Sequence, residues 1–420
     1  MQTPATSVIP VHLPPQPTRL IDRENELALL RALLSREEVR LLTLTGPGGV
    51  GKTRLAIAAA EQVQERFPDG VWFVDLAPLA DPALVVPTIA RVVGVREIPG
   101  HDPLAALTTF LGEQAIMLVL DNLEHLLAAV PVLDALLVAC PDLTILATSR
   151  EPLRLRREQV VEIRPLPVPG TEHASWTVAT LAATPAVQLF VVRAQAADAT
   201  FELSPANAEA VAELSRRLDG LPLAIELAAP RTRMLPPAAL LARLGSWLPL
   251  LTGGPRDAPA RQQTMRDAIA WSYGLLPPEQ QALFRRLAVF AGGFTLEGAE
   301  AIAGKGPHEP DLEAGAGDGL FYRHPTSPAH SPTVLEDLVA LIDHSLVQRV
   351  DAPAEQEPRY RMLETVREFA LERLEATGAA EAMRRRHLAY LVGLAERLAE
   401  RVWLPEAERV LARLDAEHDD

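Results

Sequence analysis

The chain has 420 residues and a formal net charge of −15 at pH 7, and 48% of its residues are hydrophobic. This length and hydrophobic content are typical of a globular protein of roughly two to four domains, and the negative charge argues against a whole-chain attraction to nucleic acid or anionic lipid. Because Cys140 is the single cysteine and no apolar run is long enough to span a membrane, we expect a cytoplasmic protein without internal disulfides or a membrane contact.

The start of the chain is rich in proline, which disfavours regular structure and predicts a disordered tail over residues 1–17. A helix is expected over residues 24–34. Apolar strand candidates then alternate with helical stretches, and lie at residues 40–45, 71–77, 116–121, 144–148 and 160–164. This alternation predicts an α/β domain over residues 18–165, with a mostly parallel five-stranded sheet whose ligands bind at the carboxyl ends of the strands.

A complete phosphate-binding loop follows the first of these strands and precedes a helix expected over residues 54–67. Its residues are Gly46, Pro47, Gly48, Gly49, Val50, Gly51, Lys52 and Thr53. Glycines let backbone N–H groups turn towards phosphate oxygens, the lysine adds a positive charge near the β- and γ-phosphates, and the threonine hydroxyl binds Mg²⁺. An ordinary glycine-rich turn with an exposed lysine is the alternative, but strand, loop and helix in this order favour a P-loop NTPase domain.

Two further strands end in polar residues. Asp121 ends an apolar strand, and a carboxylate at that place holds Mg²⁺ beside a phosphate loop. Its alternative role is to cap the helix expected at residues 123–129. Arg150 follows the strand at residues 144–148, and we expect it to sense the γ-phosphate, with an exposed ion pair to Glu151 as the alternative.

The base that would activate water is less clear from the sequence. Glu124 and His125 lie near Asp121, but each could equally be a solvated helix residue. Pro222, in the segment Gly220–Ala224, either contacts the ligand or only initiates a helix. No cluster of metal-ligating residues is evident in the sequence, and no Ser, His and Asp arrangement indicates covalent catalysis.

The residues after 165 have a different character. Prolines predict a linker over residues 166–185, and a small helical domain is expected over residues 186–254. Three helices followed by a strand pair predict a winged-helix domain over residues 262–377, interrupted by a disordered insertion at 304–332. C-terminal helices over residues 380–420 carry an apolar stripe without an evident partner and could begin a helical repeat.

Five segments occur in a fixed order: Leu20–Glu26, Gly46–Thr53, Met117–Asp121, Thr148–Arg150 and Gly220–Ala224. Together they resemble the NB-ARC branch of the signal-transduction ATPases called STAND, whose bacterial members include transcriptional regulators. The resemblance runs from about residue 18 to residue 418. It implies a nucleotide-binding domain, a helical domain and a winged-helix domain that close around ADP and open when ATP replaces it.

The resemblance also implies residue roles. Lys52 and Thr53 would hold phosphates and Mg²⁺, Asp121 would be the Walker B acid, and Arg150 would be the first sensor. Pro222 would contact the nucleotide from the helical domain. The set of nucleotide-binding residues is completed by Arg54, after the loop, and by two residues of the segment that would line the adenine site, Ile21 and Arg23.

Two positions depart from the family pattern. Asp22 stands where glycine is usual, and Met362-Leu363-Glu364 stands where the family often has Met-His-Asp. The usual histidine contact with the ADP β-phosphate is therefore missing.

The leading functional hypothesis is an ATP/ADP switch with slow hydrolysis, which couples nucleotide exchange to domain rearrangement and to self-association or a protein partner in transcriptional or stress regulation. We expect no direct DNA binding, since the family's winged helix usually regulates. A DNA-binding regulator that uses Arg285 and Arg286 or Arg384–Arg386 is one alternative, although these arginines are more typical of solvated faces. A small-molecule kinase is the other, and it would need a lid with clustered arginines.

Overall fold

The computed structural model describes residues 9–16, 18–95, 102–170, 176–243, 248–249, 251–252, 263–303, 333–350 and 357–399, together with Arg413 and Glu417. The chain divides into two compact units, one of residues 1–244 and 251–268 and the other of residues 245–250 and 269–420. The expected insertion at 304–332 lies outside the described residues. None of the described helices combines the length and the hydropathy needed to cross a membrane.

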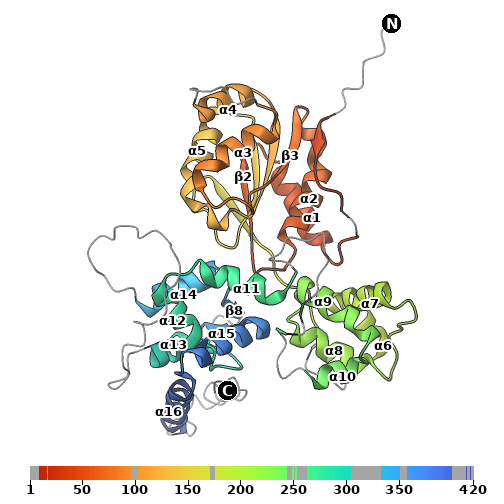
Figure 1. Cartoon of the computed structure of the whole chain (residues 1–420), viewed down its shortest axis with the longest axis vertical. Coiled ribbons are helices and arrows are strands. Elements are labelled where there is room, and N and C mark those ends of the chain that lie inside the picture. Colours follow the sequence, from red (N-terminus) through yellow and green to blue (C-terminus); the bar gives the residue numbers. More distant parts are fainter. Residues whose placement is uncertain are drawn as a thin grey trace. The chain divides into compact units, whose positions relative to one another are not determined.

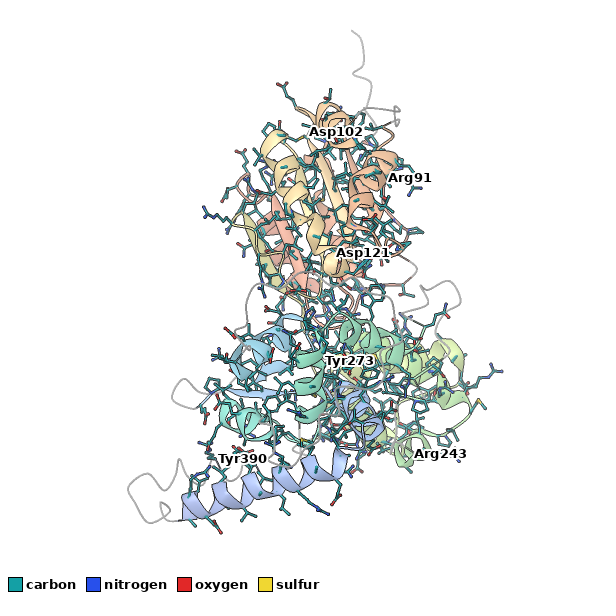
Figure 2. All side chains as sticks on the ribbon, turned by 60° about the vertical axis from the view of Figure 1, so that its left-hand side comes forward. Arg91, Asp102, Asp121, Arg243, Tyr273 and Tyr390 are labelled. Atoms are coloured by element: carbon teal, nitrogen blue, oxygen red, sulfur yellow. The ribbon has the colours of Figure 1, made fainter. Side chains whose placement is uncertain are left out.

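The first unit contains a six-stranded sheet in the order β1-β3-β4-β5-β2-β6, and every neighbouring pair is parallel. The strands are β1 (Val11–His12), β2 (Leu41–Thr45), β3 (Gly70–Asp75), β4 (Ile116–Asp121), β5 (Thr144–Thr148) and β6 (Glu158–Glu162). Strand β5 lies between β2 and β4, so the carboxyl ends of all three meet at one edge of the sheet. Figure 2 shows Asp121 at the end of this layer remote from Asp102.

Helices cover both faces of the sheet because its central strands are apolar on both sides. One face packs against α3 (Val85–Val92), α4 (Pro103–Leu111) and α5 (Val130–Ala139), with Leu118 and Leu120 of β4 in the shared core (Figure 1). The alternate residues Met117 and Val119 are also fully buried and point to the opposite face, which α1 (Glu24–Leu34) and α2 (Lys52–Val63) cover.

Strand β1 is a correction, because the sequence predicts five strands and a disordered tail over residues 1–17. Val11 and His12 pair with Val71 and Trp72, and Val71 N–H donates to Pro10 O at 2.9 Å. The His12 ring stacks on Trp72 with 4.0 Å between the centroids. Pairing with a distant strand therefore orders a proline-flanked segment that has no local tendency to form structure.

After β6, the described residues of the first unit up to residue 243 form helices. These are α6 (Val178–Ala182), α7 (Pro185–Ala197), α8 (Ala208–Arg217), α9 (Pro222–Ala228), a 3₁₀ segment η6 (Ala229–Arg233) and α10 (Pro237–Ala242). Helix α6 lies inside the stretch expected to be a linker, residues 166–185. A capping box between Thr177 and Thr180 starts this helix, a local signal that the proline content of the segment obscures.

The second unit is built around a winged helix. Helix α11 (Met265–Gly274) begins in the first unit, which ends at Ala268, and continues into the second. It is followed there by α12 (Pro278–Leu287), β7 (Phe294–Thr295), α13 (Leu296–Ala303), α14 (Val334–Asp343), β8 (Gln348–Val350), β9 (Arg359–Arg361), α15 (Glu364–Ala376) and α16 (Ala380–Ala399). The strands form an antiparallel sheet in the order β7-β9-β8, and the rings of Tyr273, Phe284 and Phe369 pack together in the core. The expected fold class, a P-loop α/β domain, a helical region and a winged helix, is thereby confirmed.

Helix α16 is a second correction, because its apolar stripe does have partners within the chain. Met383, Leu394 and Leu398 are buried, and His387 meets the Phe290 ring edge-on at 4.5 Å. Leu388 lies on the other side of the helix and stays 62% exposed. The partners precede α16 by many residues and are not evident from periodicity alone.

Candidate functional site

The loop at residues 46–53 joins β2 to α2 and has a backbone that only glycine adopts easily. Gly46, Gly49 and Gly51 have φ angles of 138°, 81° and 99°. A Cβ on Gly46 would lie 2.4 Å from Ile163 O, so strand β6 closes directly against the loop. The loop therefore leads into the N-terminus of α2, where unpaired N–H groups and the helix dipole favour an anion.

Lys52, the first residue of α2, folds back over the loop. Its Nζ donates to Gly46 O at 2.6 Å and to Pro47 O at 3.2 Å. The ammonium group thus lies within the loop rather than in solvent, where its charge can reach a bound phosphate.

Asp121, at the end of β4, connects the start of α2 to the end of β5. Its Oδ1 accepts hydrogen bonds from Thr53 Oγ1 and from Thr148 Oγ1, each at 2.6 Å, and its side chain is buried. Thr148 also accepts a hydrogen bond from Asn122 N–H at 2.9 Å. Since β5 lies between β2 and β4, Thr148 lies between Asp121, at the end of β4, and the end of β2, which leads into the phosphate loop. Asp121 does not cap an α-helix, because a 3₁₀ turn, η3 (Leu123–His125), follows it.

Arg150 and Glu151 are both buried, so neither is the exposed ion-pair partner that the alternative interpretation required. Arg150 Nε donates to Glu124 Oε1 at 3.2 Å and its Nη2 donates to Ala268 O at 3.1 Å. A Cβ on Gly48 would come within 3.0 Å of Arg150 Nη1, so the guanidinium lies against the phosphate loop.

The structure separates the two candidate bases. Glu124 is buried beside Arg150, whereas His125 Nε2 lies 2.8 Å from Leu79 O, beyond β3. Only Glu124 lines the cavity described below.

The segment before α1 lies on the other side of the loop. Arg23 is buried and donates from Nη2 to Val50 O at 3.4 Å and to Arg164 O at 2.9 Å, so it ties the loop to the end of β6. Asp22 has a φ of 53°, in the left-handed region. Glycine adopts this conformation at a lower cost than aspartate does.

Helix α9 meets the loop directly. Leu223 N–H donates to Gly49 O at 3.1 Å, and a Cβ on Gly49 would lie 2.7 Å from Leu223 Cβ. Pro222 occupies the first helical turn, where it removes no helical hydrogen bond. The helical region of the first unit therefore forms one wall of the site.

An ion network lies one turn further along α9. Glu226 Oε1 accepts from Arg193 at 2.7 Å and lies 3.9 Å from Arg54 Nη1. Arg54 also donates to Gln16 Oε1 at 3.2 Å and to Thr18 O. Burial lowers the pKa of the Arg54 guanidinium, Glu226 acts in the opposite direction, and Arg193 adds to the lowering.

Most of the predicted site residues line a single cavity. These are Ile21, Arg23, Gly48, Gly49, Val50, Gly51, Lys52, Thr53, Arg54, Glu124, Arg150 and Pro222. Gly46, Pro47 and Asp121 do not line it, but they accept hydrogen bonds from Lys52 and Thr53, which do. Leu20, from the segment expected to line the adenine site, also lines the cavity. Residues without a predicted role complete the lining: Arg19, Asn122, Leu166, Leu189, Leu223, Glu226 and Ala268. Helical spacing from Pro222 could have indicated Glu226, but no local signal points to Leu166 or Leu189.

Two protein-family models match the chain. An AAA domain matches residues 35–155, and a winged helix-turn-helix domain matches residues 326–375. The chain therefore carries an AAA-type P-loop domain and a winged helix-turn-helix.

Relatives and solved structures agree in outline. Rv0890c of Mycobacterium tuberculosis, provisionally named as an HTH-type transcriptional regulator, is 41% identical over 93% of this chain, which spans 40% of that protein's length. The STAND protein PH0952 from Pyrococcus horikoshii, which has a tetratricopeptide repeat sensor, covers 95% of this chain, and this chain covers 50% of it, at 16% identity and a TM-score of 0.34. That structural similarity is too low to support an argument.

These matches correct one expectation. The sequence led us to expect no direct DNA binding, but the winged helix-turn-helix match and the names of the regulators contradict this. The net charge of −15 describes the whole chain, whereas screening limits each charge to its surroundings within about 8–10 Å, so a local basic surface can act independently.

One relative establishes the family. The uncharacterized protein Rv0894 of Mycobacterium tuberculosis is 37% identical over 89% of this chain, which covers 86% of that protein. The chain therefore belongs to the family of P-loop proteins that includes Rv0894.

Proposed function

We propose that this chain is a nucleotide-dependent regulatory switch of the NB-ARC type, which binds ATP or ADP with Mg²⁺. The observation that supports this most directly is the wall of the cavity formed by α9. Leu223 N–H bonds to Gly49 O in the phosphate loop, and Pro222 and Glu226 line the same cavity as Lys52. A nucleotide held there would contact both the loop and the helical region, so its phosphate number can influence their arrangement.

The residue roles follow from chemistry and position. Lys52 and the loop amides would bind the β- and γ-phosphates, and Ile21 and Arg23 would lie near the base. Thr53 and Asp121 present a hydroxyl and a carboxylate 2.6 Å apart, an all-oxygen pair that suits Mg²⁺. Bound Mg²⁺ would neutralise phosphate charge. Arg150, which lies against Gly48, is placed to receive a γ-phosphate.

Slow hydrolysis is part of the proposal. Glu124, the candidate base that lines the cavity, is engaged by the buried guanidinium of Arg150 at 3.2 Å. Because Oε1 of Glu124 already accepts from this guanidinium, that oxygen is not free to accept a hydrogen bond from an attacking water. Slow ATP hydrolysis suits a signalling role, because the ATP-bound state then lasts long enough to be read. As a regulator of transcription, the protein would act in the cytoplasm, by self-association or with a protein partner.

The domain limits are part of the same proposal. We place the nucleotide-binding domain at residues 18–165, the helical domain at 186–254, the winged helix at 262–377 and the C-terminal helices at 380–420.

Calorimetry with Mg-ATP and Mg-ADP tests the proposal. Lys52→Ala should weaken binding about a hundred-fold, because it removes charge-assisted contacts to phosphate. Arg91→Ala, which removes an exposed cation on α3, is the matched control and should leave affinity unchanged. Molecular mass measured with ADP and with ATP reports assembly. Folded wild-type protein without heat of binding to either nucleotide would refute the proposal.

We also propose that the winged helix contacts DNA. The family match and the names of the relatives support this. Of the two arginine groups considered from the sequence, Arg285 and Arg286 donate to Tyr273 OH and Ala303 O, and Arg384 pairs with Glu375. The hairpin β8–β9 instead carries two exposed arginines, Arg349 and Arg361. Their pairing with Tyr360 and Gln348 puts them on opposite faces of the sheet, so each would contact a different phosphate.

A titration of duplex DNA at several salt concentrations tests this contact. Replacing Arg349 and Arg361 together by alanine should weaken binding to all sequences and reduce the slope of log affinity against log salt by about 2. Arg384→Ala with Arg385→Ala is the control, since both side chains are engaged with glutamates on the surface. An unchanged salt slope in the hairpin variant would exclude these two arginines.

A further inference from the structure

Glu226 is a carboxylate in a cavity otherwise suited to an anion. It lies one helical turn after Pro222, on the same face of α9 and about 6 Å further along the helix axis. The N-terminus of α9 bonds to the phosphate loop at Gly49, so Glu226 lies away from the phosphate end. Leu189 of α7, which is buried, and Leu20 line the cavity with it. These apolar neighbours suit a nucleoside, not a phosphate.

The two oxygens of Glu226 have different surroundings. Oε1 accepts from Arg193 Nε at 3.1 Å and from Arg193 Nη2 at 2.7 Å, and Arg54 Nη1 lies 3.9 Å from it. Among the residues that the structure describes, no hydrogen bond to Oε2 is seen. The side chain is 27% exposed. Arg193 therefore fixes the carboxylate through one oxygen and leaves the other available at the cavity.

We propose that Glu226 selects the nucleoside part of the bound nucleotide by accepting a hydrogen bond, through Oε2, from a donor on the sugar or on the base. This rests on the nucleotide-binding function proposed above. An ionised carboxylate is an acceptor only, so it favours a hydroxyl or an amine and repels a phosphate. Glu226 thus also orients the ligand, with its phosphates towards Lys52 and its nucleoside towards α9.

Glu226→Gln tests the proposal with little change of shape. The amide oxygen must face Arg193, since both arginine groups are donors, and this turns the amide nitrogen towards the position of Oε2. The variant keeps its anchor while the available acceptor becomes a donor. Glu213→Gln is the matched control: Glu213 accepts from Arg216 and Arg217, has a similar exposure of 21%, and does not line the cavity.

The measurement is the affinity of each protein for Mg-ADP, Mg-2′-deoxyADP and Mg-IDP. Wild type and Glu213→Gln should bind ADP about ten-fold more tightly than one of the two analogues, the size expected for one hydrogen bond to a charged acceptor. Weak binding of 2′-deoxyADP identifies the ribose hydroxyl as the donor, and weak binding of IDP identifies the adenine amine. In Glu226→Gln that preference should disappear.

The opposing results are distinct. Equal selectivity in wild type and Glu226→Gln overturns the inference, as does a uniform loss of affinity for all three nucleotides in the variant, which indicates a purely structural role. A change of selectivity in Glu213→Gln overturns it as well. If the folded wild type binds none of the three nucleotides, it is the proposed nucleotide-binding function that fails.

Discussion

The buried ion pair between Arg150 and Glu124 allows a quantitative test of how the site is held together. The exposed fractions of the two side chains are 7% and 3%, and Arg150 also donates to Ala268 O. Replacement of one partner leaves the other charge buried without its counter-ion, which typically costs about 3–5 kcal/mol. We therefore expect Arg150→Met and Glu124→Leu each to lower the stability of the first unit by about that amount.

The double variant should be much less destabilised than the sum of the two. Neither charge then remains, and a buried pair replaced by apolar side chains is often nearly neutral in free energy. The coupling energy from the double-mutant cycle should be at least about 2 kcal/mol. The control is the pair Arg157 and Asp134, which has the same Nε donor at 2.7 Å but is 37% and 40% exposed, and its coupling should stay below about 1 kcal/mol.

Hydrogen exchange of the β4 and β5 amides is a suitable assay, because it reports opening of this sheet separately from the second unit. The protein is studied without nucleotide, so that loss of ligand affinity does not enter the result. Single variants that cost less than about 1 kcal/mol, or a cycle in which the two costs simply add, would refute the reasoning, since either result means that the pair is hydrated rather than buried.

Three further predictions use positions outside this pair. Gly46→Ala should abolish ADP binding, as measured by calorimetry, because a Cβ at position 46 would lie 2.4 Å from the backbone oxygen of Ile163. It should also lower the urea midpoint of the first unit more than Gly94→Ala does. Gly94 is the control because it also has a positive φ, but a Cβ there meets no atom within 4 Å. Asp22→Gly should raise the free energy of unfolding of the first unit by up to about 1 kcal/mol, because it relieves a left-handed aspartate at φ 53°; a urea midpoint below that of the wild type would contradict this. Burial raises the pKa of Asp337 above 3.8, so its ionised form disfavours the fold at neutral pH. Asp337→Asn should therefore stabilise the second unit at pH 7, and the gain should shrink as the pH falls through the raised pKa towards 3.8; a gain that is independent of pH would count against it.

The parts of the molecule that the sequence predicts well are those with a local cause. The phosphate loop is evident because its glycines, lysine and threonine must be adjacent, and the strand before Asp121 is evident because it is apolar throughout. The start of α9 follows from Pro222, which the sequence analysis read as a possible helix start.

The parts that escaped prediction depend on pairing between distant residues. Strand β1 exists only because β3 offers it an open edge. The bridging role of Thr148 requires that β5 insert between β2 and β4, an order that strand patterns do not reveal. The link between Glu226 and Arg193 needs the packing of α7 against α9.

The hydrogen bond between Leu223 and Gly49 has a consequence for dissecting the chain. A recombinant fragment that ends at residue 165 would keep every glycine of the motif and the whole parallel sheet, yet it would lose the helical wall of the cavity. Leu223 would no longer contact Gly49, and water would occupy its place. Such a fragment is therefore a poor mimic of the intact protein for ligand measurements, and activity should be sought in pieces that extend at least through α9.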